Sequence, residues 1–282
     1  MAESTQPDKF KATWVSHSKI NDFNNCPRLF YLRNIYKDPI TRNKIALVEP
    51  PLALGQAVHE ILEDLTNFSV DERLHLPLVK KFETDWDEKY AGKKGGFKTS
   101  VESDEAKKRG KDMIERVMKH PGPIANKAIK IKSDFADLPY YWLSEEENII
   151  LCGKIDWLEY LESEDKVHIV DFKTGRRDES EDSLQLPVYL LIATHTQSRE
   201  VAKASYWYID RENEPREYPL PNLEESKELV MKQAKRIKLA VQLDHFKCPK
   251  GGCMHCSKYE EILAGNATKV GESSYQDVYA LV

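Results

Sequence analysis

The chain has 282 residues, 40 % of them hydrophobic, which is enough for one sizeable core and a smaller lobe. Its formal net charge of -5 excludes a general attraction to nucleic acid or membranes, so any site for a polyanion must be local. The sequence has neither a run of roughly 18 apolar residues nor the apolar core of a signal peptide at its start. Five cysteines, an odd number, argue against a disulfide framework. We therefore expect a cytoplasmic protein with no membrane partner.

The first part of the chain is predicted to be mainly helical. A polar segment, residues 1–13, is expected to be flexible. Two short helices then fall within residues 18–36, where Ser18 can cap the first helix and Pro27 can begin the second. Residues 52–65 show the spacing of apolar residues that is typical of an amphipathic helix.

The remainder of the chain alternates between helices and strands. Strands rich in Val, Ile and aromatic residues are separated by charged turns, and Asn222 is a predicted N-cap. The predicted strands are 149–160, 167–173 and 201–210, and the predicted helices are 76–120, with a glycine-rich interruption, 184–195 and 222–243. This order predicts one α/β domain over residues 14–262, and the polar segment 263–282 is expected to be a tail.

Charged residues occur on one face of a predicted β-hairpin. Because side chains alternate along a strand, Val167, Asp171 and Lys173 share a face. If Tyr160 pairs with Val167, Asp156 falls opposite Asp171, and a slip of two residues keeps both aspartates on that face. Facing carboxylates lie about 5 Å apart and repel each other. A fold tolerates them when a cation lies between them or when one is protonated.

This pattern suits the hydrolysis of phosphodiester bonds. A divalent metal held by oxygen ligands neutralises an anionic phosphate and lowers the pKa of bound water. The Lys173 ammonium could orient the attacking water or offset charge that develops in the transition state. The simpler alternative is that Asp171 and Lys173 form a surface ion pair at the end of a strand. The second aspartate on the facing strand favours a metal site.

The segments "GKID", residues 153–156, and "IVDFKTG", residues 169–175, resemble the core of the PD-(D/E)xK nuclease superfamily. They are most similar to its RecB-like branch, which includes the nuclease halves of bacterial helicase-nucleases and the CRISPR-adaptation exonucleases. The resemblance extends in ordered motifs from about Ser16 to Cys256. It implies a restriction-endonuclease-like fold, in which helices flank a mixed sheet and a helical and metal-cluster lobe closes over it.

The resemblance also implies roles for individual residues. Asp156 and Asp171 correspond to the metal-binding carboxylates and Lys173 to the catalytic lysine. The backbone carbonyl of Phe172 corresponds to a further metal ligand. His59 matches a helical histidine that joins the metal shell in this branch, although a lone histidine on a helix is more often structural. The metal would be Mg or Mn, and an imidazole among carboxylates shifts the preference toward Mn.

Other polar residues near this core are candidates for contact with DNA. The segment "LQLPVY" resembles the family's Q-x-x-x-Y helix, in which Gln185 and Tyr189 share a face and could contact DNA or brace the lysine. Ordinary polarity at the surface of an apolar helix is the alternative. Arg176 and Arg177 follow the catalytic strand and are placed to contact backbone phosphates. The ring of Tyr189 could also stack against the bases of a single strand.

Four cysteines form a second candidate site. Cys248, Cys253 and Cys256 have the spacing C-x4-C-x2-C, and Cys26 precedes them by more than two hundred residues. RecB-like iron–sulfur nucleases also place one cysteine before the nuclease core and three after it, although their usual tail is C-x2-C-x5-C. The resemblance implies a 4Fe–4S cluster, whereas four thiolates also suit zinc, and buried thiols without a site are the third alternative. Cys152 is predicted to pack in the core.

These expectations point to a metal-dependent DNA nuclease, a phosphodiester hydrolase. It would be an exonuclease that acts on DNA ends or single strands in DNA repair, recombination or CRISPR adaptation, where a helicase or integrase partner would supply the substrate. The alternative from another class is a catalytically silent nucleic-acid-binding or adaptor protein of the same fold. The retention of Asp156, Asp171 and Lys173 argues against it, because a silent copy has no reason to keep carboxylates that repel each other.

Overall fold

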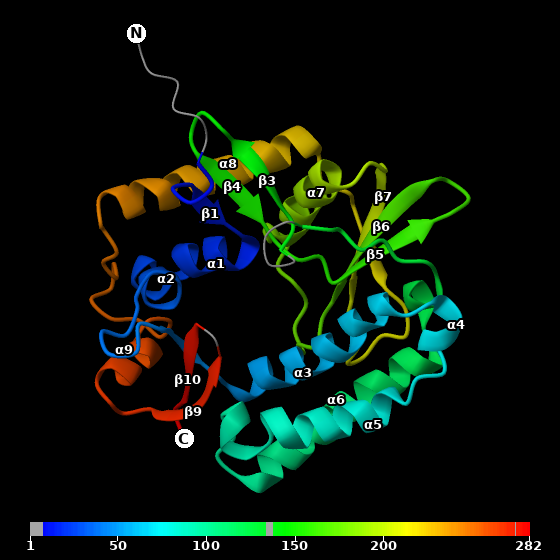
Figure 1. Ribbon diagram of the computed structural model, residues 1–282, viewed down its shortest axis with the longest axis horizontal. Helices are drawn as coiled ribbons and strands as arrows, with labels where there is room; N and C mark the ends of the chain where they lie inside the picture. The colour runs from blue at the N-terminus through cyan, green and yellow to red at the C-terminus, as the bar shows by residue number, and fades with distance from the viewer. Residues whose placement is uncertain (1–7, 134–137, 274) are drawn as a thin grey trace.

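Figure 1 shows the computed structural model of the chain, which describes residues 8–133, 138–273 and 275–282. Helices and strands alternate as predicted, and the α/β class is confirmed. The α-helices are α1 His17–Asn25, α2 Pro27–Asn34, α3 Pro50–Asp64, α4 Val70–Arg73, α5 Leu78–Asp85, α6 Ser100–Lys119, α7 Gln185–Thr196, α8 Leu223–Gln242 and α9 Ser257–Leu263. The strands outside the central sheet are β1 Thr13–Val15, β2 Lys44–Leu47, β3 Tyr140–Ser144, β4 Ile149–Cys152, β9 Thr268–Ser273 and β10 Gln276–Ala280.

The central sheet has four strands in the order β5, β6, β7, β8. β5 (Trp157–Leu161) pairs antiparallel with β6 (Lys166–Phe172), and β6 pairs parallel with β7 (Val201–Trp207). β8 (Arg216–Tyr218) completes the sheet antiparallel to β7. A parallel step requires a crossover connection, and α7 provides it between β6 and β7. The predicted mixed sheet is therefore confirmed.

Helices cover both faces of this sheet (Figure 1). Val167 and Ile169 of β6 pack into the apolar cluster that contains residues of α7 and α8. Val170 and Phe172 pack into the cluster formed with α3, α5 and α6. Because strand residues alternate between faces, Asp171 shares the face of Ile169 and lies on the side of α7. β6, which immediately precedes the candidate lysine, is thus buried on both sides up to its end.

The prediction of one strand over residues 149–160 is wrong. β4 pairs with β1 and β3 in a separate sheet, whereas β5 belongs to the central sheet. The chain passes from one sheet to the other through residues 153–156. At Gly153 a side-chain carbon would lie 2.8 Å from Ile192 of α7, so glycine eases this close approach. The apolar composition hid the break because β4 and most of β5 are buried.

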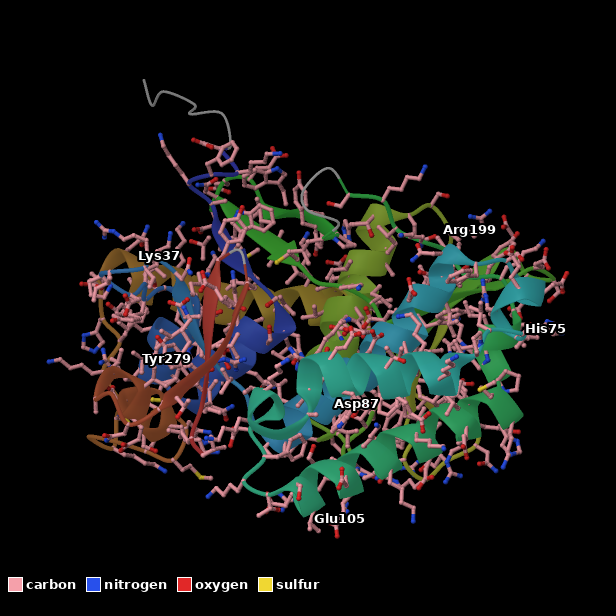
Figure 2. The ribbon with its side chains drawn as sticks, turned by 60° about the horizontal axis from the view of Figure 1, so that its bottom comes forward. Lys37, His75, Asp87, Glu105, Arg199 and Tyr279 are labelled. Carbon is pink, nitrogen blue, oxygen red and sulfur yellow. The ribbon has the colours of Figure 1, made fainter. Side chains whose placement is uncertain are left out.

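A smaller lobe gathers segments from both ends of the chain. β2 pairs parallel with β10, and β10 pairs antiparallel with β9. Its apolar cluster joins α2, β2 and α9 and includes the buried Cys26 and Cys256. Figure 2 shows Tyr279 of β10 and Lys37 at this end of the molecule, with His75 and Arg199 at the opposite end. The segment 263–282, expected to be a tail, therefore contains two strands of this lobe.

The starts of three helices test the predicted capping residues. Pro27 begins α2, as expected, and the Asn222 side chain caps α8 by accepting a hydrogen bond from the Glu225 amide. α1 is capped by Ser16, whose hydroxyl accepts from the amide of the third residue of the helix, and not by Ser18. The segment 1–13 was predicted to be flexible. Its residues 1–7 lie outside the described residues, and its last residue, Thr13, begins β1.

Candidate active site

The hairpin of β5 and β6 has the register expected from the sequence. Tyr160 pairs with Val167, and the ladder continues without a bulge toward the other end of the hairpin. Asp156, the residue before β5, therefore comes opposite Asp171 of β6. The backbone N–H of Phe172 donates a hydrogen bond of 2.8 Å to Oδ2 of Asp156. Backbone pairing thus brings the two carboxylates to the same end of the hairpin.

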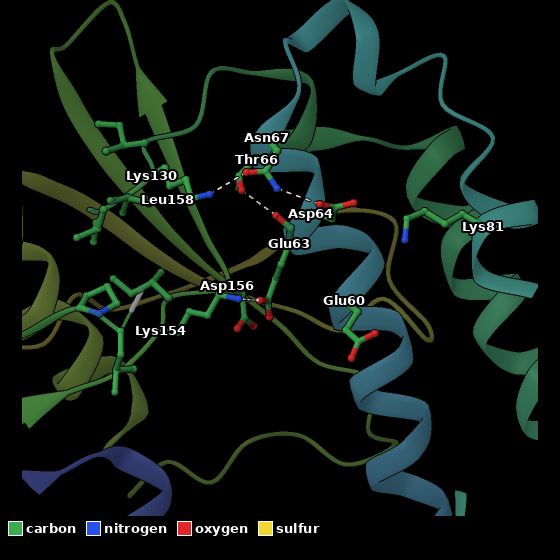
Figure 3. A pocket seen from close by; sticks show the side chains of 15 residues that line it. Glu60, Glu63, Asp64, Thr66, Asn67, Lys81, Lys130, Lys154, Asp156 and Leu158 are labelled. Atoms are coloured by element: carbon green, nitrogen blue, oxygen red, sulfur yellow. Dashed lines mark hydrogen bonds and ion pairs between the residues drawn. The ribbon is translucent and has the colours of Figure 1, made fainter. Parts of the chain in front are cut away.

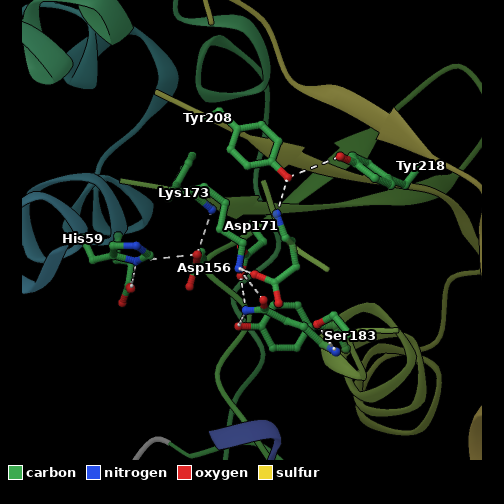
Figure 4. Close-up of polar contacts among 12 residues, drawn as sticks. His59, Asp156, Asp171, Lys173, Ser183, Tyr208 and Tyr218 are labelled. Carbon is green, nitrogen blue, oxygen red and sulfur yellow. Dashed lines mark hydrogen bonds and ion pairs between the residues drawn. The ribbon is translucent and has the colours of Figure 1, made fainter. Parts of the chain in front are cut away.

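Three side chains at this end form a group that could hold a metal ion. His59 and Glu63 lie one turn apart on α3, and Asp156, which immediately precedes β5, lies beside them. Figure 4 shows His59 and Asp156 facing each other. Nδ1 of His59 lies 3.3 Å from Oε1 of Glu63 and 3.5 Å from Oδ2 of Asp156. One ligand atom from each residue falls within 4.8 Å of the other two. Glu63 was missed by sequence analysis, although its spacing of four from His59 places both on one helix face.

Asp171 lies deeper and faces the lysine. It is 2 % exposed, and its Oδ2 forms an ion pair of 2.9 Å with Nζ of Lys173 (Figure 4). Oε2 of Glu179 lies 3.0 Å from the same ammonium. Glu179 comes from the irregular segment between β6 and α7, where no periodic pattern could indicate it. The ammonium is therefore held between two carboxylates, and the surface ion pair considered from the sequence is wrong.

Gln185, the first residue of α7, connects these groups. Its side-chain amide donates hydrogen bonds of 2.5 Å to Oδ1 of Asp171 and 3.2 Å to the hydroxyl oxygen of Tyr189. Its carbonyl oxygen accepts a hydrogen bond from Lys173. Gln185 and Tyr189 are both buried, so neither is merely a polar side chain at the surface of the helix. The Tyr189 ring is 7 % exposed and offers no face to a stacking base. These contacts favour the bracing interpretation.

Burial and neighbouring charges shift the pKa values of the site. Burial, together with the charge of Asp156, raises the pKa of Asp171 from 3.8 to about 7. Burial lowers the pKa of His59, but the carboxylates of Asp156, Glu63 and Asp171 together outweigh this and hold it well above 6.5. At Lys173, burial also lowers the pKa, but the carboxylates of Asp171 and Glu179 together outweigh it, and the pKa is raised. The lysine therefore stays an ammonium, and burial, together with the charge of Asp156, favours the protonated form of Asp171.

The donors of this site fit a divalent metal ion. Oδ2 of Asp171 is buried and accepts no hydrogen bond among the described residues, because Lys173 faces it as an ion pair without hydrogen-bond geometry. A cation beside the carboxylates would offset the repulsion that raises the Asp171 pKa. Oxygen ligands suit Mg and Mn, and the His59 imidazole is compatible with Mn.

The two predicted arginines follow β6 on the surface. Arg176 and Arg109 both line a cavity of about 650 Å³. Arg177, the next residue after Arg176, is exposed. The guanidinium of Arg109 donates a hydrogen bond of 2.7 Å to the backbone carbonyl of Thr174. Arg211 donates to the carbonyl of Arg176 at 2.9 Å. Two arginines thus hold the segment that carries the predicted phosphate contacts.

The predicted cysteine quartet comes together in the smaller lobe. The sulfur atoms of Cys26, Cys248, Cys253 and Cys256 all lie within 4.8 Å of one another. None of these cysteines forms a disulfide in the described chain. Four clustered thiols can bind zinc or a 4Fe–4S cluster, and this geometry does not favour buried thiols without a site. Cys152 is buried elsewhere and donates to a backbone carbonyl at 3.3 Å, as expected for core packing.

A mixed sheet between helices, with an Asp-x-Lys pair at the end of its central hairpin, defines a nuclease-type domain. The family model of the PD-(D/E)XK nuclease superfamily matches residues 14–259. The chain belongs to this superfamily, and the resemblance found in its motifs is confirmed at that level. A comparison with curated proteins found no match. No helix in the described part of the chain combines the length and the apolar character needed to cross a membrane.

Proposed function

We propose that the protein hydrolyses phosphodiester bonds in DNA with Mg or Mn, as an exonuclease that acts on ends or single strands. One observation carries the proposal: the Lys173 ammonium lies 2.9 Å from Asp171, beside the ligand group of His59, Glu63 and Asp156. A fixed ammonium next to metal ligands suits phosphodiester hydrolysis, because both offset the charge that develops in the transition state. Membership of a nuclease superfamily supports the same reaction.

The ligand residues have a common task in this reaction. His59, Glu63, Asp156 and Asp171 would hold the cation, with the backbone carbonyl of Phe172 as a further ligand. A bound divalent cation neutralises the scissile phosphate and lowers the pKa of the attacking water. Because the Phe172 N–H fixes Asp156, this carboxylate keeps its place when substrate enters.

Lys173 and its neighbours supply the remaining charge. Its raised pKa keeps the ammonium charged at neutral pH, so it can orient the attacking water or offset charge in the transition state. Gln185 bonds to both Lys173 and Asp171 and thereby sets their relative positions. Glu179 would keep hold of the ammonium when the Asp171 carboxylate is engaged by a cation.

The basic side chains beyond β6 would bind the DNA backbone. Arg176 and Arg177 follow the catalytic strand directly, and Arg109 lines the same cavity as Arg176. A chain with a net charge of -5 needs such local cations, because its overall field does not attract a polyanion.

The cysteine quartet would hold a 4Fe–4S cluster, with zinc as the alternative. Cys26 lies at the junction of α1 and α2, whereas Cys256 immediately precedes α9. A cluster here joins segments that are far apart in sequence and so restricts the unfolded chain. The ion pair of 2.6 Å between Arg28 and Glu260 links the same two segments.

The RecB-like branch is part of this proposal, as is a role in DNA repair, recombination or CRISPR adaptation. The order of His59, Asp156, Asp171 and Lys173, with a cysteine on each side of this core, supports the branch. In each of these processes DNA ends are produced or trimmed, and a helicase or integrase partner would deliver them.

An assay with labelled substrates tests the proposal. Single-stranded and double-stranded DNA, labelled at either end, and RNA of the same sequence are incubated with Mg, Mn or a chelator. We expect DNA to shorten progressively from an end with either metal and to stay intact with the chelator. Binding without metal-dependent cleavage under all these conditions would instead support a silent nucleic-acid-binding or adaptor protein.

A further inference from the structure

A cavity of about 580 Å³ adjoins the ligand group and has no task in the reaction described above. It lies between α3 and residues 66–67 on one side and residues 129–131 and 154–158 on the other (Figure 3). We infer that this cavity, here called the α3 pocket, binds one unpaired nucleotide of the strand being cut. The inference rests on the proposed nuclease function, because Glu63 and Asp156 belong both to the pocket wall and to the ligand group.

The walls of the α3 pocket differ in character. One wall is apolar, which suits the face of a base, and a rim of hydroxyl, amide and amine groups suits the sugar and phosphate. The apolar side chains that keep exposed surface there are Ile129, Ile131, Leu138 and Ile155. The polar groups of the rim include Thr66, Asn67, Lys130 and Lys154 (Figure 3).

Lys130 is the lysine of the pocket whose charge is free to meet a phosphate. Its Nζ lies 2.8 Å from Oδ1 of Asn67, which is a neutral partner. Within the described ranges, no carboxylate lies within 4.0 Å of this ammonium. Lys154, by contrast, is paired with Glu63, and Lys81 is paired with Asp85. A phosphate can therefore bind Lys130 without breaking an existing ion pair.

The acidic residues of the pocket are already engaged. Glu60 accepts a hydrogen bond of 2.6 Å from the Tyr90 hydroxyl and pairs with Lys89 at 3.3 Å. Asp64 accepts a hydrogen bond of 2.9 Å from the side chain of Asn67. Glu63 belongs to the ligand group, where the charge of a bound cation would offset its own. The repulsion that a phosphate meets near Lys130 is reduced accordingly.

The size of the pocket distinguishes an unpaired nucleotide from a duplex. Pockets of about 300–1,000 Å³ enclose small organic ligands, and a volume of about 580 Å³ lies within this range. In a duplex the base is stacked and paired, so it would enter the pocket only if it were flipped out, which costs a few kcal/mol. The strand would therefore enter the pocket unpaired, with one base against the apolar wall and its phosphate at Lys130.

Binding measurements on three variants test the α3 pocket in a Lys173→Ala background, which slows cleavage by about a hundredfold or more. Lys130→Ala removes the free ammonium, and Ile131→Glu places a carboxylate in the apolar wall. Lys127→Ala is the matched control, because Lys127 is exposed, pairs with Glu162 at 2.6 Å and does not line the pocket. Affinity for a fluorescent oligothymidylate and for a blunt duplex is measured by anisotropy at several salt concentrations with Mn, and melting temperature checks the fold of each variant.

We expect Lys130→Ala to weaken single-strand binding about fivefold and to reduce the salt slope by about 0.7, the value for one phosphate contact. Ile131→Glu should weaken it about tenfold, as expected for the loss of one base contact. Duplex binding, and all binding by Lys127→Ala, should change less than about twofold.

Three results would overturn the inference. If Lys130→Ala and Ile131→Glu bind single strands as tightly as Lys127→Ala does, the subsite does not exist. Cleavage by the wild type would in that case still support the nuclease proposal. An equal loss on single strand and duplex would make Lys130 a general surface cation. If the wild-type protein cleaves no nucleic acid with any metal, both the nuclease proposal and the subsite that rests on it are refuted.

Discussion

Oδ2 of Asp156 accepts a hydrogen bond of 2.8 Å from the backbone N–H of Phe172, the residue that follows Asp171. The strand that carries one carboxylate therefore fixes the other. Such a contact depends on backbone pairing and on one short side chain, so it positions the carboxylate more firmly than a long flexible side chain could. α3 then adds His59 and Glu63 from the opposite side.

Lys173→Ala should abolish most of the activity without unfolding the protein. Removal of a charge that acts in the transition state costs about a hundredfold to a thousandfold in rate. The variant should still bind metal, and its circular dichroism spectrum should match that of the wild type. Single-turnover cleavage of labelled DNA is the measurement.

Lys166→Ala is the control for this change. Lys166 lies at the other end of β6 and pairs with Glu200 at 3.1 Å, away from the ligand group. Its loss should alter the rate less than about twofold, since exposed ion pairs contribute little. A near-normal rate for Lys173→Ala would refute the role given to this lysine.

Asp171→Asn should raise the stability of the metal-free protein in a pH-dependent way. The folded-state pKa of Asp171 is raised from 3.8 to about 7, so the native state favours the protonated form. The stability that protonated Asp171 contributes to the wild type is then fully present below about pH 4 and is lost as the pH rises through about 7. Asparagine stays neutral and avoids this loss, which has a ceiling of about 4 kcal/mol.

Urea unfolding in the presence of chelator, at pH 5 and pH 8, measures this difference. The advantage of Asp171→Asn over the wild type should be larger at pH 8, whereas DNA cleavage with Mg or Mn should be lost. A variant that is clearly less stable than the wild type at pH 8 would show that the two carboxylates do not repel each other in the metal-free protein.

Glu63→Gln should weaken metal binding, because it removes one of the anionic donors grouped with His59 and Asp156. The expected loss in affinity for Mn is about tenfold or more, measured by calorimetry. Glu60→Gln is the matched control, since Glu60 lies on the same helix but bonds to Tyr90. Equal affinities for the two variants would exclude Glu63 from the ligand set.

The cysteine quartet predicts a metal content that depends on each of its members. Protein purified without oxygen should be brown and contain about four iron atoms per chain, and colourless protein with about one zinc would change the metal but keep the site. Cys248→Ser should lose the metal and melt at a lower temperature, because the cluster links the two ends of the chain.

Cys152→Ala is the control for the quartet, because Cys152 is buried away from the cluster. It should retain the full metal content and show only the modest destabilisation of a small core truncation. If Cys248→Ser keeps both its metal and its stability, the fourth ligand is another residue.

The local features of the site could be predicted from the sequence. Side-chain alternation put Asp171 and Lys173 on one face, and a short charged turn set the hairpin register that brings Asp156 opposite Asp171. The break at residues 153–156 could not be predicted, because two buried strands from different sheets form one continuous apolar pattern. β9 and β10 were missed because their sequences are polar and partly exposed.

The sequence by itself determined the hairpin, the order of the ligands and the presence of four cysteines outside the core. The tertiary structure decided that Glu63 joins His59 and Asp156, that Glu179 holds Lys173, and that β10 pairs with β2. The physical reason is the range of the interactions. The register of a hairpin and the periodicity of a helix are set by residues that are close in sequence. The other contacts depend on how distant segments pack, which the local sequence pattern does not specify.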